Sequence, residues 1–312
     1  MGRFSITENL SSPFEVSYQE LVLLKNLVAK HKSTQVRAKQ GAMLHASKIR
    51  GRGMDYVETR NYFPGDDVRL MDWRVTARTN KPHVKVFEVE KERPVLILLN
   101  MSPTMFFGSR ICLKSVFAAQ LASLLAWTAK AHGDRVGGML TSMVKSTLLL
   151  PHAHNATLSK FLKMVSHATS YYQDKAWNDW LSVERHEYFL RALRKVTKTL
   201  KPGTLIIIIN DWYEEESLIQ SYLYELRSRH DLILYHVHDA LERSISGHGV
   251  YPISNGQSIK LLNSKYHNNY CAENMQRWQT IANKISVPYY SCSSETDLSL
   301  LVRQSLLRSL CG

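Results

Sequence analysis

The chain has 312 residues, 44% of them hydrophobic and 21% charged, which is the balance of a globular protein large enough to bury a core without disulfides. Its four cysteines are widely scattered and include no CxxC pair, so we expect reduced thiols in a cytoplasmic protein. The sequence shows no secretory signal and no apolar stretch of bilayer length, which predicts that no segment spans a membrane.

The net charge of +13 is unevenly distributed. The segment from Lys25 to Arg93 holds 16 Lys or Arg against 8 Asp or Glu. Such a segment attracts nucleic acid, anionic lipid or an acidic protein face. Carboxylates alternate with its basic residues and favour internal pairing over a phosphate-binding stripe. Nucleic-acid binding through residues 25–93 is therefore an alternative to our main interpretation.

Apolar positions at helical spacing predict one amphipathic helix over residues 18–32. Residues 60–78 are instead dense in charged, aromatic and turn residues, and Pro64-Gly65 predicts a tight turn. We expect at least one arginine to grip Asp66 or Asp67 through two parallel hydrogen bonds, tying this segment to the main domain, with Trp73 as an apolar anchor. The residues of this candidate interaction segment are Arg60, Tyr62, Pro64, Gly65, Asp66, Asp67, Arg69, Asp72, Trp73 and Arg78.

A second interpretation of this segment is catalytic, with Asp66, Asp67 or Asp72 as the acid–base groups of a hydrolase. Four nearby arginines favour the charged carboxylates, which suits them poorly to proton transfer at neutral pH. We therefore prefer a structural or binding role for the segment.

Strands and helices alternate after Pro94, which predicts a mostly parallel sheet with helices on both faces. The apolar run Val95–Leu99 ends at Asn100, and a second run over residues 204–209 ends at Asn210-Asp211. Continuous apolar runs are typical of buried parallel strands. Polar residues that follow them lie at the carboxyl edge of the sheet, where open α/β sheets bind ligands.

The stretches RNYFPGDDVRLMDWRVTAR, VFEVEKERPVLILLN and GDRVG resemble the bacterial family called domain of unknown function 58. That family is similar to von Willebrand factor type A domains, so the resemblance implies a doubly wound α/β fold plus a smaller β-rich subdomain. We expect a tail and helix at 1–38, the subdomain at 39–93 and the α/β domain at 94–312. A hairpin at 240–265 is a candidate addition to the subdomain.

The resemblance also implies a metal-ion-dependent adhesion site with the pattern Asp-x-Ser-x-Ser. Asn100, Ser102 and Thr104 stand at these positions, with Asp211 and Thr157 as the candidates that complete the site. Asn100 lacks the charge of the usual aspartate, so we expect Mg²⁺ to bind no more tightly than millimolar. An equally weighted alternative is that Asn100 and Asp211 only cap turns and helix starts. His152 and His154 could also ligate a metal, but the sequence near them offers no Cys, His or carboxylate cluster to complete such a site.

The sequence contains no Ser-His-Asp, Cys-His, P-loop or zinc-hydrolase pattern, so we expect no catalytic residues and no enzyme activity. Members of the resembling family are typically encoded beside MoxR-type AAA+ ATPases. The resemblance therefore implies an interaction or adaptor protein that works with such an ATPase and an unknown protein client.

Overall fold

The structure is a computed structural model, and it describes residues 12–39, 54–89, 92–142, 145–170, 185–213, 216–243, 245, 249–254 and 259–303. The chain divides into two compact units. The α/β unit contains residues 1–33 and 93–312, and the small unit contains residues 34–92.

A six-stranded sheet forms the centre of the α/β unit, in the order β10-β7-β6-β3-β4-β5. Every neighbouring pair is parallel except β4 and β5, which are antiparallel. Counted from the antiparallel edge, the strands follow the 3-2-1-4-5-6 order of doubly wound sheets. The strands are β3 (Pro94–Met101), β4 (Arg135–Ser142), β5 (Ser146–His152), β6 (Leu205–Asn210), β7 (Asp231–His238) and β10 (Tyr289–Ser293).

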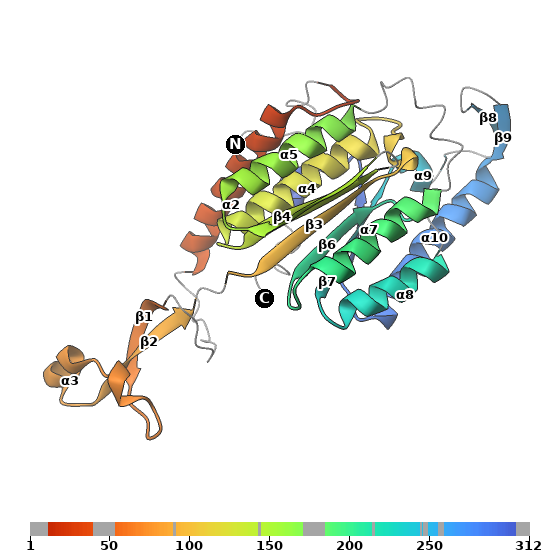
Figure 1. Cartoon of the computed structure of the whole chain (residues 1–312). Coiled ribbons are helices and arrows are strands. Elements are labelled where there is room, and N and C mark those ends of the chain that lie inside the picture. The colour runs from red at the N-terminus through yellow and green to blue at the C-terminus, as the bar shows by residue number, and fades with distance from the viewer. Residues whose placement is uncertain are drawn as a thin grey trace. The chain divides into compact units, whose positions relative to one another are not determined.

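Two hydrophobic cores lie on opposite faces of this sheet, because side chains alternate along each strand. In β3, Val95, Ile97 and Leu99 enter one core and Leu96 and Leu98 the other. One face is covered by α2 (Tyr18–Lys39), α4 (Lys114–Ala131), α5 (Asn155–Thr169) and α11 (Leu298–Arg303), the other by α7 (Arg185–Thr199), α8 (Glu216–Arg227) and α10 (Ser264–Lys284) (Figure 1). The expected fold class, a doubly wound and mostly parallel sheet with helices on both faces, is confirmed.

The N-terminal helix packs on the α/β unit. Leu21 of α2 is fully buried, and its carbonyl oxygen accepts hydrogen bonds from Ser123 Oγ (2.7 Å) and Trp127 Nε1 (3.0 Å) of α4. The hairpin of β8 (Val250–Ser254) and β9 (Ile259–Asn263) also belongs to this unit and leads directly into α10. The observed division therefore differs from the expected boundaries 1–38, 39–93 and 94–312, and from the joining of 240–265 to the small unit.

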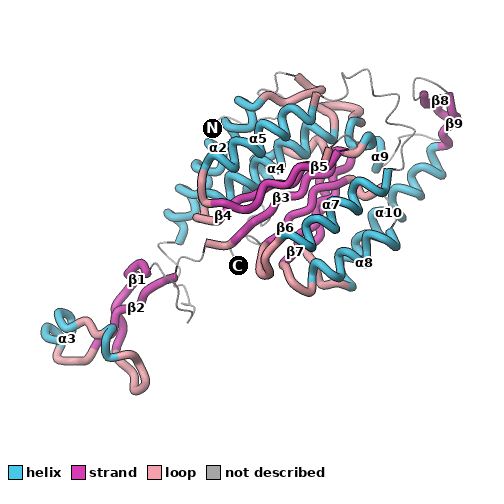
Figure 2. The backbone as a smooth tube through the Cα atoms, in the orientation of Figure 1, coloured by secondary structure: helices cyan, strands magenta, loops and turns pink. Residues whose placement is uncertain are grey.

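The small unit is built on the antiparallel pair β1 (Met54–Asn61) and β2 (His83–Val89), as Figure 2 shows in magenta. Between them the chain forms a 3-10 turn (Val68–Leu70) and the short helix α3 (Trp73–Thr79). Asp72 caps α3 by accepting from the backbone N–H groups of Arg74 and Val75. At the other end, Asn80 adopts the left-handed conformation (φ 54°) that commonly ends a helix.

Candidate functional site

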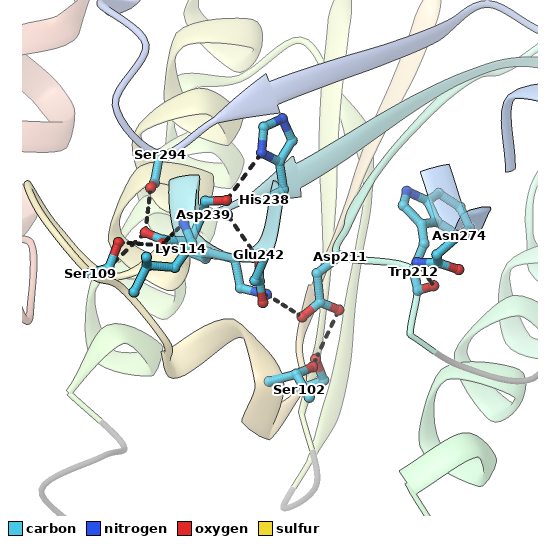
Figure 3. Close-up of polar contacts among 12 residues, drawn as sticks. Ser102, Ser109, Lys114, Asp211, Trp212, His238, Asp239, Glu242, Asn274 and Ser294 are labelled. Atoms are coloured by element: carbon cyan, nitrogen blue, oxygen red, sulfur yellow. Dashed lines mark hydrogen bonds and ion pairs between the residues drawn. The ribbon is translucent and has the colours of Figure 1, made fainter. Parts of the chain in front are cut away.

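The carboxyl edge of the sheet brings together four of the five residues expected in the adhesion-type site. Because β3 and β6 are neighbours, Asn100 Nδ2 donates to Asn210 Oδ1 at 2.9 Å. Beyond the end of β3, Ser102 Oγ lies 2.9 Å from Thr104 Oγ1 and 3.5 Å from Asp211 Oδ1 (Figure 3). The expected juxtaposition of Asn100 and Asp211 on adjacent strand ends is thus present.

A lysine that belongs to none of the predicted motifs lies at the centre of this edge. Lys114, the first residue of α4, is fully buried, and its Nζ lies 3.0 Å from Asp211 Oδ2 and 2.6 Å from Glu242 Oε1 (Figure 3). Its Nζ also lies 5.1 Å from the centre of the Tyr213 ring. Burial opposes the charged amine, but Asp211 and Glu242 outweigh it and raise the pKa of Lys114.

Glu242 completes the ionic cluster from α9 (Ala240–Arg243), which follows β7. Burial raises the pKa of Glu242, and the Lys114 ammonium acts in the opposite direction. The Lys114 amine is fully buried and in direct contact with two carboxylates, which stabilise its protonated form.

Asp239 joins three chain segments beside this cluster. Its fully buried carboxylate accepts from Ser109 N (3.0 Å) and Ser109 Oγ, from Ser294 Oγ (3.1 Å) and from Leu241 N (2.9 Å). Burial alone would raise the pKa of Asp239, but these hydrogen bonds, above all those from Ser109, lower it. Its own backbone N–H donates to Glu242 Oε2 at 2.8 Å. Asp239 therefore fixes the loop before α4, the start of α9 and the end of β10 around the lysine.

The backbone after β6 also holds the site in place. Trp212 is fully buried and has the left-handed conformation (φ 55°), which is uncommon for a bulky residue. Its carbonyl oxygen accepts from Trp278 Nε1 (2.9 Å) and Asn274 Nδ2 (3.3 Å) of α10. These bonds fix the backbone immediately after Asp211.

The expectation that Thr157 completes the site is wrong. Because β5 runs antiparallel to β4, its last residue, His152, pairs with Val136 at the beginning of β4. Thr157, in the first turn of α5, follows that end and lies at the amino edge of the sheet, opposite Asn100. His152 and His154 lie on the same side with rings 6.0 Å apart. Within the described ranges, no three His, Cys, Asp or Glu side chains are grouped so that they could hold a metal.

In the small unit, Arg60 grips Asp66 through Nη1–Oδ2 (2.8 Å) and Nη2–Oδ1 (2.7 Å). The expected bidentate pair therefore exists, but both residues belong to the small unit, so the pair closes a local turn and does not tie the segment to the α/β unit. Gly65 (φ 104°) makes that turn. Asp67 and Asp72 accept from backbone N–H groups that follow them.

Trp73 is not the buried anchor we expected. Its side chain is 67% exposed, and Phe63 is 63% exposed. Trp73 stands at the first position of α3, a helix with no buried residue, so its ring is left largely open to solvent.

A doubly wound sheet with hydroxyl, amide and carboxylate groups at its carboxyl edge defines an open-sheet α/β protein whose candidate ligand site lies at that edge. The chain belongs to the family described as "Protein of unknown function DUF58", whose sequence model matches residues 58–279. Two relatives are "Uncharacterized protein Rv1480" of Mycobacterium tuberculosis (strain ATCC 25618 / H37Rv) and "Uncharacterized protein Mb1516" of Mycobacterium bovis (strain ATCC BAA-935 / AF2122/97). Each is 37% identical over 98 residues, which is 31% of this chain and 31% of the relative. The matches therefore span about a third of the length of these relatives.

Among solved structures, the chain is similar to the crystal structure of conserved hypothetical protein BatB from Bacteroides thetaiotaomicron. The sequence identity is 16% and the TM-score 0.46, over 70% of this chain and 98% of that one. None of the helices in the described part of this chain combines the length and apolarity needed to cross a membrane.

Proposed function

We propose that this protein is a non-catalytic interaction protein of the cytoplasm, and that the carboxyl edge of its sheet binds another protein. We further propose that it acts with a MoxR-type AAA+ ATPase and delivers or holds a protein client. The role of the ATPase rests on the family resemblance and not on the geometry of the site.

The exposed groups of the loop between β3 and α4 are the main support for the proposed binding role. The loop presents the half-buried hydroxyls of Ser102 and Thr104 and the 43% exposed ring of Phe107. Behind it, the carboxylates of Asp211 and Asp239 are buried and occupied by internal donors. An edge with polar groups around an aromatic side chain suits a protein partner. The internal hydrogen bonds of Asp211 and Asp239 suit these two carboxylates poorly to proton transfer.

An affinity capture tests this proposal. Tagged wild-type protein is incubated with a purified MoxR-type ATPase of the same organism, with and without ATP and Mg²⁺. We expect Phe107→Ala to reduce capture of the ATPase at least tenfold. Leu150→Ala, which removes a similarly exposed apolar side chain from β5, serves as the matched control and should leave capture unchanged. Failure of the wild type to retain the ATPase, or equal capture by F107A, would contradict the proposal.

Nucleic-acid binding by the small unit is the second candidate, and one observation favours it. We expected carboxylates to pair with the basic residues, yet Arg69, Arg74 and Arg78 are exposed and form no ion pair with any residue that the structure describes. Exposed arginines near exposed aromatic rings such as Trp73 are typical of single-strand binders.

Fluorescence anisotropy with labelled oligo-dT and an unrelated duplex distinguishes this candidate from a protein partner. A nucleic-acid binder would show affinity that falls steeply with salt and drops in Arg74→Ala/Arg78→Ala. Absence of binding at low salt would remove the candidate. The hydrolase alternative is less consistent with the contacts, because Asp66 is held by Arg60 and Asp72 caps α3.

A further inference from the structure

The fold resemblance implies a divalent cation at the carboxyl edge, and the buried side chains there do not fit one. Mg²⁺ requires near-ideal octahedral oxygen ligands, of which carboxylates contribute the charge. Asp211 is the carboxylate expected to serve, but its Oδ2 accepts from Lys114 Nζ at 3.0 Å. The second nearby carboxylate, Glu242, accepts from the same nitrogen at 2.6 Å.

We propose that the Lys114 ammonium takes the place of the divalent cation, so that this edge is organised by a cation that belongs to the chain itself. The ammonium links the loop after β6 to α9, as a bound metal would link carboxylates from two loops. Its location is otherwise unfavourable, because it is fully buried and stands at the first position of α4, where the helix dipole repels a positive charge.

Asn100 supports the same inference from a second position. Its Nδ2 donates to Asn210 Oδ1 at 2.9 Å, whereas an aspartate at this position would present a carboxylate to the carbonyl oxygen of that side chain. The amide thus contributes a hydrogen-bond donor where the adhesion-site pattern has a metal-binding charge. The amide of Asn100 in place of a carboxylate and the ammonium of Lys114 each reduce the affinity of this edge for a divalent cation.

Removal of the ammonium should turn the cluster into a metal site. In Lys114→Met the methionine keeps most of the length of the side chain, and Asp211 and Glu242 are left as two carboxylates with no cation between them, near the hydroxyls of Ser102 and Thr104. We expect the variant to melt well below the wild type in EDTA and to regain most of the lost Tm in millimolar Mn²⁺. The Tm of the wild type should not respond to Mn²⁺, and calorimetry should detect no wild-type Mg²⁺ or Mn²⁺ site tighter than millimolar.

Lys160→Met, which removes an exposed lysine from α5, is the matched control and should behave as the wild type with and without Mn²⁺. If K114M does not fold in EDTA, refolding in Mn²⁺ decides: recovery of the native far-UV and near-UV spectra supports the proposal. A K114M protein that Mn²⁺ neither stabilises nor refolds would show that the lysine makes an ordinary buried ion pair, and micromolar metal binding by the wild type would equally overturn the inference.

This inference rests on the proposed function in one respect only, which is that a partner protein binds this edge of the sheet. Thermal melting with Mn²⁺ requires no partner, so its failure is distinguishable from a failure of the ATPase capture.

Discussion

A neutral histidine lies beside the charged cluster. His236 is buried in β7, with Nδ1 2.5 Å from the Tyr289 hydroxyl. Burial, and then the neighbouring His238 and Lys114, lower its pKa from 6.5 to about 3. Because the folded pKa is below the unfolded one, the unfolded chain binds more protons between these two values. The free energy of unfolding must therefore rise with pH in that window, and the contribution of His236 to it is lost as pH falls below about 6.5.

We predict that the wild type loses about 2 kcal/mol of unfolding free energy between about pH 6.5 and pH 5 through this group. His236→Asn retains a polar group near Tyr289 and cannot titrate, so its pH slope should be shallower. His238 and His230, whose pKa values burial also lowers, contribute to the remaining slope. Urea unfolding at a series of pH values measures both slopes. The exposed His154→Asn is the control, and an H236N slope equal to that of the wild type would refute the assignment.

Asp239 gives a prediction in a lower pH range. In Asp239→Asn an NH₂ group faces hydrogen-bond donors that meet a carboxylate oxygen in the wild type. The variant should therefore lose about 2–3 kcal/mol of unfolding free energy at neutral pH. Since the folded pKa of Asp239 is lowered, its contribution is complete above its ordinary pKa of 3.8 and is lost as pH falls below it. The difference between D239N and wild type should thus narrow in acid. Denaturant titrations at neutral and acid pH test this, and the exposed Glu225→Gln should show neither effect.

The residues that the sequence could not assign are those whose partners lie far along the chain. Lys114 stands at the start of an apolar helix, where a charged residue usually marks the exposed end of the helix. Its partners Asp211 and Glu242 are 97 and 128 residues away. Only the strand order brings them together, and hydrophobic periodicity does not determine strand order. Asn100 and Asp211 were predictable because each directly follows a long apolar run.

At the scale of elements, the contact between β4 and α5 depends on a glycine. A Cβ on Gly138 would lie 2.0 Å from Cδ2 of Phe161, which is itself fully buried. Gly138→Ala should therefore destabilise the protein by about 1–3 kcal/mol through overpacking. In G138A/F161L the smaller leucine provides room for the methyl group, so we expect the double variant to lose less stability than the two single costs combined. Additive costs in urea unfolding would show that the two residues do not compete for space.

The direction of β5 follows from the short connection between β4 and β5, which can be read from the sequence. The mostly parallel sheet that we predicted did not include the antiparallel pairing of β4 and β5. Ser142 and Ser146 are separated by three residues, and a parallel crossover needs about a dozen, so the two strands have to form a hairpin. That constraint alone places Thr157 at the amino edge. The long runs of β3 and β6 were predictable because buried parallel strands are apolar on both faces.

At the scale of the whole molecule, the small unit is an insertion into the sequence of the α/β unit. The small unit, residues 34–92, begins within the last turns of α2 and ends just before β3, yet α2 contributes Leu21, Leu27 and Val28 to the same core as β3. The expected boundaries set the tail and helix at 1–38 apart from the α/β domain, because hydrophobic periodicity predicts a helix without showing which sheet it covers. The N-terminal helix should consequently unfold together with the α/β unit.

Leu21→Ala tests this organisation. Leu21 is fully buried against α4, so its truncation should lower the free energy of unfolding of the α/β unit by about 2–5 kcal/mol. Leu23→Ala, two residues along the same helix at a side chain that is 61% exposed, should cost less than about 0.5 kcal/mol. Tryptophan fluorescence during urea unfolding includes Trp127, whose indole N–H donates to the Leu21 carbonyl. If L21A shifted only a separate early transition and left the main midpoint in place, α2 would be an independent appendage. A shift of the main midpoint in L21A would instead establish α2 as part of the α/β core, because all parts of a single cooperative unit share the loss of stability.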